Sequence, residues 1–309
     1  MNVYDQISAN NRSTAMILCA FPVALFVMLF LLSLLLVQTD ILPFATPIGS
    51  TLMIFPWIFL VAFIWIIISY FKGGAMILGM AHAHPITFEE NKELFRLVEN
   101  TAIMAGLPTP KIYLIKDESL NAFAIGRKPE EASVALTEGI VNKLDKAALQ
   151  AVIAHELAHI GNRDTRLMII TVAGIGCFIF FGELLLRSAG RVGRGNKKGG
   201  QAALVILAIG VVCLLFGYLV APILRFALSR RREYQADATA VKITRDPDAL
   251  ARALSKIAED PRVEALDASP LVGNMCIANP GKAGFISKLY LTHPPLEHRI
   301  IALRKMMGH

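Results

Sequence analysis

Long apolar stretches alternate along this chain with segments that carry regular charges. Residues 14–38 contain no charged side chain, and a second apolar run covers residues 51–71 after a short polar region that contains Pro and Gly. About 20 apolar residues in a helix are enough to cross a bilayer. These two runs predict an N-terminal transmembrane hairpin over residues 14–71. The first run is too long for the apolar part of a cleaved signal peptide, so we expect it to remain as an anchor.

Two further apolar runs occur in the second half of the chain, at residues 167–186 and 202–224. Their lengths predict a second hairpin over residues 167–224, and therefore four transmembrane helices. The loop between them, residues 187–201, is rich in Gly, Lys and Arg. This composition is typical of a loop that contacts anionic lipid.

The basic residues beside the runs predict the orientation of the chain, because cytoplasmic loops are enriched in Lys and Arg. The loop inside the first hairpin has neither residue, whereas Lys72 and a cluster that begins at Arg225 follow the second and fourth runs. We therefore expect the segments behind Lys72 and Arg225 in the cytoplasm. Loop 187–201 would lie on the opposite side if both later runs cross. The sequence leaves open whether that hairpin crosses completely or is re-entrant.

Residues 81–166 and 225–309 have the composition of water-soluble segments, with regular charges and no lipid-length apolar run. In the first segment the apolar period predicts a helix over residues 85–106 that ends at Gly106 and Pro108. A second helix is predicted over residues 143–159. Between the two helices, stretches rich in β-branched or apolar residues predict three strands, at residues 111–115, 121–125 and 132–137.

The overall composition agrees with a protein that is partly embedded in lipid. Of the 309 residues, 55% are hydrophobic and 18% are charged, with a mean hydropathy of +0.54. These values exclude a disordered or collagen-like chain and an ordinary soluble protein. The net charge is +7, but no nucleic-acid-binding signature accompanies it, so no nucleic-acid partner is expected. The four cysteines are scattered and form no CxxC pair, which favours neither a disulfide framework nor cysteine-bound zinc.

An HExxH motif occupies residues 155–159, within the predicted helix 143–159. Residues four apart lie on one face of a helix, so His155 and His159 can bind the same ion. Glu156 is offset from that face and can hold a water molecule next to the ion. The alternative is a pair of histidines that merely line a helix. The helical context and a third ligand elsewhere in the chain favour zinc.

A catalytic zinc ion takes three protein ligands and leaves its fourth position for water. Glu233 follows the fourth apolar run directly, and Asp237 lies one helical turn beyond it. We therefore predict one Zn²⁺ per chain, bound by His155, His159 and Glu233. Asp237 is expected to accept the remaining N–H of a ligating histidine. Without the HExxH motif, the ExxxD pair alone would be interpreted as a solvated helix face.

Several motifs, taken in order, resemble those of the HtpX family of membrane zinc metalloproteases, which is related to the CAAX prenyl proteases. The resemblance covers nearly the whole chain and rests on the HExxH motif, Asn162-Arg163-Asp164, Glu233 with Asp237, His293-Pro294-Pro295 with Arg299, and Asn121-Ala122-Phe123-Ala124. It implies a bacterial inner-membrane endopeptidase whose active site is cytoplasmic and whose third zinc ligand is Glu233. The substrates it implies are damaged or misfolded membrane proteins, in stress-related quality control.

The mechanism expected for this residue set is metal-assisted hydrolysis. Zinc lowers the pKa of its water and polarises the scissile carbonyl, while Glu156 accepts the proton and delivers it to the leaving amine. The resemblance puts His293 near the site, which makes it our candidate donor to the developing oxyanion; Arg299 is a second candidate. Without the resemblance, His293-Pro294-Pro295 favours a plain turn at the start of a helix.

A protease of this kind binds its substrate in an extended form, and an unpaired sheet edge supplies backbone hydrogen bonds for it. Residues 132–137 or 121–125 are the candidate edge strands, and each is equally compatible with a buried strand. The metal helix runs within a few residues into the third apolar run. We therefore expect zinc near the membrane surface, with membrane-protein or unfolded polypeptide substrates and the lipid bilayer as partners.

Two other classes of function remain open on the sequence. An intramembrane-cleaving metalloprotease would carry its HExxH motif inside a lipid-length run, but here polar residues stand on both sides of the motif. A membrane chaperone without enzymatic activity would not need Glu156. His82 and His84 are interpreted as part of a juxtamembrane linker, and Glu183 as a carboxylate that reaches the lipid headgroups.

The sequence thus predicts a mainly α membrane protein with four transmembrane helices and an α+β zincin-like catalytic domain that contains a small sheet. The predicted order is a first hairpin over residues 14–71, a first part of the catalytic domain over 81–166, a second hairpin over 167–224, and a second part of the catalytic domain over 225–309. The two parts of the catalytic domain have to meet, because the proposed ligands come from both.

Overall fold

The computed structural model describes residues 3–36, 46–192, 197–226, 230–259, 276–277 and 294–307. His293, the candidate oxyanion donor, lies outside these residues, as does part of loop 187–201. The chain divides into two compact units. One, the globular unit, comprises Met1–Asn10, Lys72–Ile169 and Arg225–His309; the other, the membrane unit, comprises Asn11–Phe71 and Ile170–Leu224.

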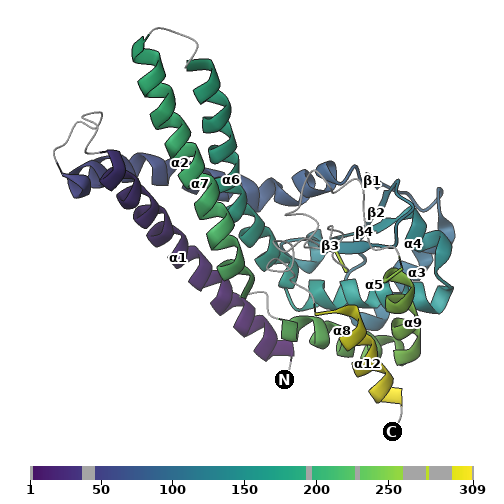
Figure 1. The fold of residues 1–309 in the computed structure, drawn as a ribbon. Helices are drawn as coiled ribbons and strands as arrows, with labels where there is room; N and C mark the ends of the chain where they lie inside the picture. The colour runs from purple at the N-terminus through teal and green to yellow at the C-terminus, as the bar shows by residue number, and fades with distance from the viewer. Residues whose placement is uncertain are drawn as a thin grey trace. The chain divides into compact units, whose positions relative to one another are not determined.

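The apolar runs form long helices (Figure 1), which are α1 (Val3–Leu36), α2 (Pro47–Met80), α6 (Asp164–Val192) and α7 (Lys197–Phe226). Within the part of the chain that the structure describes, three candidate membrane spans stand out by length and apolar composition: Thr14–Leu34, Pro47–Met80 and Asp164–Arg191. In α7 the apolar stretch Ala203–Gly217 is shorter. The mainly helical membrane architecture is therefore confirmed, and the fourth crossing stays a prediction.

The helices of the membrane unit turn large apolar side chains outward. Val23, Trp57 and Leu204 are among the residues whose side chains are mostly exposed. An apolar surface of this extent is unfavourable in water but is the expected outer surface of helices in lipid. The unit has its own small core, which contains Phe21, Leu25, Met28, Leu29, Ala62, Cys177, Phe178 and Cys213.

Small residues bring α6 and α7 close together inside the membrane unit. A Cβ atom added at Gly182 would lie 2.7 Å from Cγ of Leu214, and one added at Gly210 would lie 2.9 Å from Cδ2 of Leu186. Such positions allow the close backbone approach on which helix packing in lipid depends. Close packing of α6 against α7 at these two glycines therefore stabilises the hairpin.

Helix α2 is joined to α6 through Trp65. Its Nε1–H donates a hydrogen bond to the backbone oxygen of Ala173 at 3.2 Å. The indole ring also stacks on Phe180, with ring centroids 4.9 Å apart. A buried indole N–H needs an acceptor, and in this unit a helix carbonyl supplies it.

The globular unit contains a small mixed sheet of four strands, β1 (His84–Pro85), β2 (Lys111–Ile115), β3 (Ala122–Ile125) and β4 (Ser133–Thr137). Its order is β1-β2-β4-β3, with β2 and β4 parallel and the other pairs antiparallel. The three predicted strands are confirmed within one residue at each end. Because β4 lies between β2 and β3, the expectation that residues 132–137 form a free edge is wrong; β3 is an edge strand.

Two of the predicted helices begin later than expected, each at an N-cap residue. The first, α3 (Lys92–Ala105), starts after Asn91, whose side chain accepts the N–H of Leu94; Pro85 belongs instead to strand β1. It ends at Gly106 as predicted, with a left-handed φ of 67°. The second predicted helix is interrupted, since residues 138–143 form α4 and a new helix starts after Asp145.

Helix α5 (Lys146–Gly161) is the central element of the globular unit. The Asp145 carboxylate caps its N-terminus by accepting the N–H of Ala148 at 2.9 Å. It packs against β3 and against α3, α8 (Arg230–Thr244) and α9 (Pro247–Ile257). From Ala151 to Ile160 every side chain is buried. A helix that is covered on all sides holds its polar side chains in a dry interior.

Candidate metal centre

Two histidines on consecutive turns of α5 face each other. The Nε2 atoms of His155 and His159 lie 3.2 Å apart, and the two rings are nearly perpendicular, with an interplanar angle of 88°. The motif spacing therefore has the effect that the sequence predicts, because one helical turn puts both ring nitrogens at the same point.

A third side chain reaches this point from α8. Oε2 of Glu233 lies 3.6 Å from Nε2 of His155, and Oε1 lies 3.6 Å from Nε2 of His159. Together the three side chains form a group whose potential ligand atoms lie within 4.8 Å of one another. Helices α5 and α8 are packed side by side, so the second part of the globular unit meets the first at these residues.

The distances in this group fit a tetrahedral metal ion. Zinc bound by nitrogen and oxygen at about 2.0–2.2 Å has ligand atoms roughly 3.3–3.5 Å apart. The separations of 3.2 and 3.6 Å lie close to this range. Two imidazoles and one carboxylate are also a donor set that zinc accepts in catalytic sites. The residues present therefore fit the metal.

Each histidine is oriented by a carboxylate on its other ring nitrogen. Nδ1 of His155 lies 3.0 Å from Oδ1 of Asp237, as the sequence predicts, and Nδ1 of His159 lies 2.9 Å from Oδ2 of Asp164. A carboxylate on Nδ1 fixes the tautomer that leaves Nε2 free to bind metal. Arg232 lies 3.6 Å from the other oxygen of Asp164.

Asp164 was not among the residues expected at the site from the sequence. It comes next to His159 because α5 ends at Gly161, with Asn162 as its C-cap, and Arg163 adopts a left-handed backbone, with φ of 60°, before Asp164 begins α6. The sequence contains a hint of this contact, because Asp164 follows His159 by only five residues. A single tight turn over that distance can bring the carboxylate back to the imidazole.

Arg299, on α12 (Leu296–Met307), is completely buried beside the centre. Its Nε and Nη2 atoms donate to the two oxygens of Asp237 at 2.9 and 2.6 Å. Nη1 donates to the backbone oxygen of Ile277 at 3.1 Å and lies 3.4 Å from Oε2 of Glu233. This guanidinium thus holds Asp237 in a bidentate pair, which is a supporting position and not that of an oxyanion donor.

Residues 276–277 link this network to the sheet. The N–H of Ile277 donates to the backbone oxygen of Ala122 at 2.8 Å, on the outer edge of β3, while its carbonyl accepts from Arg299. Sequence reasoning missed this contact because no pattern marks it. Cys276 is buried beside Glu156: burial raises the pKa of its thiol, and the negative charge of Glu156 adds to the increase. Glu156 itself is 2% exposed.

The carboxylates around the two imidazoles stabilise positive charge there. Burial acts to lower the pKa of His155, but the carboxylates of Asp237 and Glu233 outweigh it and the pKa is raised. For His159, the hydrogen bond to Asp164 and the charge of Glu233 outweigh burial and raise the pKa to about 9. An environment that favours a proton on both imidazoles also favours a metal cation that replaces those protons.

Comparisons with known proteins show which family this chain resembles. Residues 89–307 match peptidase family M48. A protease HtpX homolog of Bacteroides fragilis is 37% identical over 321 residues, which cover 99% of both chains. One from Dictyoglomus turgidum is 41% identical over 243 residues, which cover 78% of this chain and 77% of the relative. The crystal structure of S. mikatae Ste24p is similar with a TM-score of 0.48 and 19% identity, covering 81% of this chain and 58% of that one.

Proposed function

Since this chain belongs to peptidase family M48, as one of its HtpX-type membrane metallopeptidases, we propose that it cuts peptide bonds at a zinc ion held by His155, His159 and Glu233. The observation that carries the proposal is the convergence of three side chains: the two Nε2 atoms lie 3.2 Å apart, and each lies 3.6 Å from an oxygen of the Glu233 carboxylate. The carboxylates of Asp237 and Asp164 hold the rings in the orientation that this requires.

A zinc ion in this group would supply a Lewis acid that polarises the scissile carbonyl and makes a water molecule acidic. Glu156 acts as the general base: it accepts the proton of the attacking water and delivers it to the leaving amine. Its position supports this role, because Glu156 is 2% exposed and follows His155 directly on α5, beside the proposed zinc ion. His293 is proposed as the donor to the developing oxyanion.

The substrate chain is proposed to pair with the outer edge of β3. Backbone groups of alternate residues of an edge strand point away from the sheet, and the pairing of β3 with β4 leaves those of Ala122 and Ala124 on the outer side. Ile277 already bonds to Ala122, so the part of the edge around Ala124 would receive the peptide. Backbone pairing requires an extended chain but no particular sequence. Unfolded polypeptides and damaged membrane proteins can meet this requirement.

The proposed location is the bacterial inner membrane, with the globular unit in the cytoplasm. The distribution of basic residues supports this orientation, because Lys72 follows the second apolar run and the loop of the first hairpin has no Lys or Arg. A protease whose metal helix is followed within three residues by a membrane helix would meet its substrates near the lipid surface. Quality control of membrane proteins is the role that this position fits.

Cleavage of casein by the detergent-purified protein, compared between the wild type and Glu156→Gln, tests the mechanism. We expect the rate to fall by about 10²- to 10⁴-fold, because the variant keeps the shape but loses the base. Bound zinc should remain at one ion per chain. Glu93→Gln, an exposed carboxylate on α3, is the matched control and should cut at the wild-type rate. A Glu156→Gln variant that cuts as fast as the wild type would remove Glu156 from the mechanism.

The zinc content of Glu233→Ala tests the third ligand. We expect the bound metal to fall well below one ion per chain, because two histidines alone bind zinc weakly. Glu259→Ala, an exposed carboxylate that follows α9, should keep its metal. If Glu233→Ala retains both stoichiometric zinc and activity, the third ligand lies elsewhere.

A further inference from the structure

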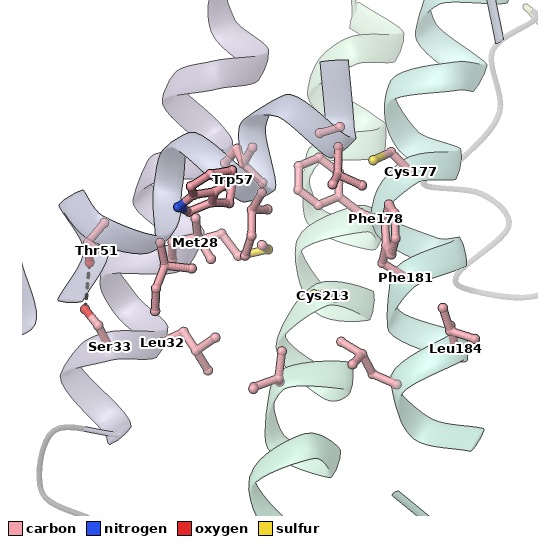
Figure 2. A pocket seen from close by; sticks show the side chains of 18 of the residues that line it. Met28, Leu32, Ser33, Thr51, Trp57, Cys177, Phe178, Phe181, Leu184 and Cys213 are labelled. Carbon is pink, nitrogen blue, oxygen red and sulfur yellow. Dashed lines mark hydrogen bonds between the residues drawn. The ribbon is translucent and has the colours of Figure 1, made fainter. Parts of the chain in front are cut away.

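The membrane unit contains a cavity of about 480 Å³ (Figure 2), which is partly open to the outside of the unit, since Trp57 and Leu184 in its lining are 70% and 50% exposed. Its walls come from α1, α2, α6 and α7, so that side chains such as Met28, Trp57, Phe181 and Cys213 face the same space. The lining is almost entirely apolar. Because all of the residues that line it belong to the membrane unit, the cavity lies among the apolar runs, and no residue of the metal centre is part of its lining.

Three hydroxyl groups lie together at one end of this cavity. Ser33 Oγ and Thr51 Oγ1 are 2.9 Å apart, and each also lies within hydrogen-bond distance of the backbone oxygen of Pro47, at 2.9 and 2.8 Å. The third hydroxyl, that of Ser50, is different: the residue is 0% exposed, and its Oγ has no hydrogen-bond partner among the described residues. A buried polar atom without a partner is costly in an apolar environment, so a ligand with a hydrogen-bonding group is expected at this end.

The sequence position of these hydroxyls sets their depth in the membrane. Ser33 lies in the last turn of the span Thr14–Leu34, and Ser50 lies in the first turn of α2. Trp57, two turns further along α2, is 70% exposed at the cavity wall, and tryptophan is enriched where the apolar core meets the headgroups. The polar end of the cavity is therefore at the level of the membrane interface, and the apolar remainder extends toward the middle of the bilayer.

The volume distinguishes a lipid chain from a helix. One turn of an α-helix with side chains fills roughly 400–600 Å³, from its diameter of about 10–12 Å and pitch of 5.4 Å, so this cavity would hold only a single turn. A cavity of about 150 Å³ holds one benzene ring. On that scale 480 Å³ accommodates about nineteen carbon atoms, which is close to the size of one acyl chain.

We propose that this cavity binds one acyl chain of a membrane phospholipid, whose ester carbonyl accepts a hydrogen bond from Ser50. In a bilayer the ester groups of phospholipids lie at the interface and their chains extend into the core, which matches the order of hydroxyls and apolar residues in the cavity. The lipid becomes part of the packing between the first hairpin and the second. This site is independent of the proposed peptidase mechanism, since no residue of the metal centre lines it.

The test is native mass spectrometry of the full chain, purified in detergent and supplied with a defined diester phospholipid. We expect one tightly retained phospholipid per chain. Ala62→Phe places a ring in the cavity, since Ala62 lines it and is buried, and should reduce retention at least tenfold. Ile68→Phe makes the same kind of change on the exposed face of the same helix and should leave retention unchanged. Unchanged metal content and casein cleavage would show that both variants fold.

Ser50→Ala provides a second, milder test of the polar end. Loss of one hydrogen bond should weaken retention of the diester lipid about 2- to 10-fold, while retention of the ether-linked analogue should not change. Ser69→Ala, at another buried serine of α2, is the control. The proposal is overturned if no lipid is retained, if Ala62→Phe retains as much as the wild type, or if Ser50→Ala weakens both lipids equally. Displacement of the phospholipid by an equal concentration of palmitate would overturn the choice of a phospholipid.

Discussion

The globular unit and the membrane unit bury opposite kinds of groups. In the globular unit, His155, Glu156 and His159 are almost completely shielded from solvent, and each imidazole has a carboxylate on Nδ1. In the membrane unit the buried polar groups include the hydroxyls of Ser33 and Thr51, which are neutral and bond to each other and to the backbone. One unit is organised around charge, and the other around shape.

This difference predicts where the protein is sensitive. A buried charge is tolerated only beside a fixed charge of opposite sign. If one partner is removed, the remaining charge stays buried without compensation, and its full desolvation penalty destabilises the fold. In lipid, both the folded and the partly separated helices have apolar surroundings, so a single hydrogen bond contributes little. Substitutions that unbalance charge in the globular unit should therefore be much more damaging than those that remove a hydrogen bond in the membrane unit.

Arg299→Ala should have the largest effect. It removes the counter-charge of Asp237 and the donor to Ile277, while the Asp237 carboxylate stays buried. We expect the free energy of unfolding of the globular unit, measured in denaturant, to fall by about 3–5 kcal/mol. Arg304→Ala, at an exposed position of the same helix, should change it by less than about 0.5 kcal/mol. A loss below about 1 kcal/mol for Arg299→Ala would contradict the view that charge balance organises this unit.

Asp164→Asn should weaken metal binding while the fold is retained. The variant keeps the size of the side chain, but it replaces the negatively charged carboxylate that faces Nδ1 of His159 with a neutral amide. Outer carboxylates of this kind typically contribute about 10- to 100-fold to metal affinity, so zinc titration against a chelator should show a decrease of that size. Asp248→Asn, a half-exposed carboxylate on α9, is the control. Equal affinities for the two variants would leave Asp164 with no role at the centre.

Gly210→Ala probes the shape-based packing of the membrane unit. The added methyl group would lie 2.9 Å from Leu186 and 3.1 Å from the backbone oxygen of Gly182, which forces α6 and α7 apart. Overpacking of this kind costs about 1–3 kcal/mol, visible as a lower melting temperature in detergent. Gly190→Ala meets nothing within 4 Å and should be neutral. Equal melting temperatures for the two variants would show that close packing at Gly210 does not stabilise the hairpin.

Trp65→Phe should have the smallest effect. It removes the hydrogen bond to the carbonyl of Ala173 but retains an aromatic ring against Phe180. Hydrogen bonds between membrane helices average about 0.6 kcal/mol, so the melting temperature should fall only slightly. A decrease as large as that of Arg299→Ala would break the contrast between the two units.

The parts of the centre that could be predicted from the sequence are those in which spacing alone sets geometry. His155 and His159 converge because they are one helical turn apart, and Glu233 and Asp237 share a face of α8 for the same reason. Asp145 could have been recognised as a helix start, because a short acidic side chain before a run of helix formers is a typical N-cap. The prediction of a single helix over residues 143–159 did not take this N-cap into account, and so it began too early.

Other features depend on contacts that no local pattern encodes. The two residues of β1 are too few to show a strand period. Arg299 meets Asp237 across 62 residues, and Ile277 reaches Ala122 from a different part of the chain; only tertiary packing brings them together. The cavity of the membrane unit is likewise a product of how four helices fit, and hydropathy records only that each helix is apolar. The fold class and the convergence of the two histidines therefore follow from periodicity, whereas the contacts that support them do not.

Asp164 has two duties, since it orients His159 and is also the first residue of α6. No linker therefore separates the carboxylate that orients the His159 ring from the helix that enters the third apolar run. A water-soluble form of the peptidase therefore cannot be made by excising α6 from its beginning. Any such truncation has to retain the first residues of that helix, up to about Ile169, where the segment Lys72–Ile169 of the globular unit ends, and replace only the portion beyond them.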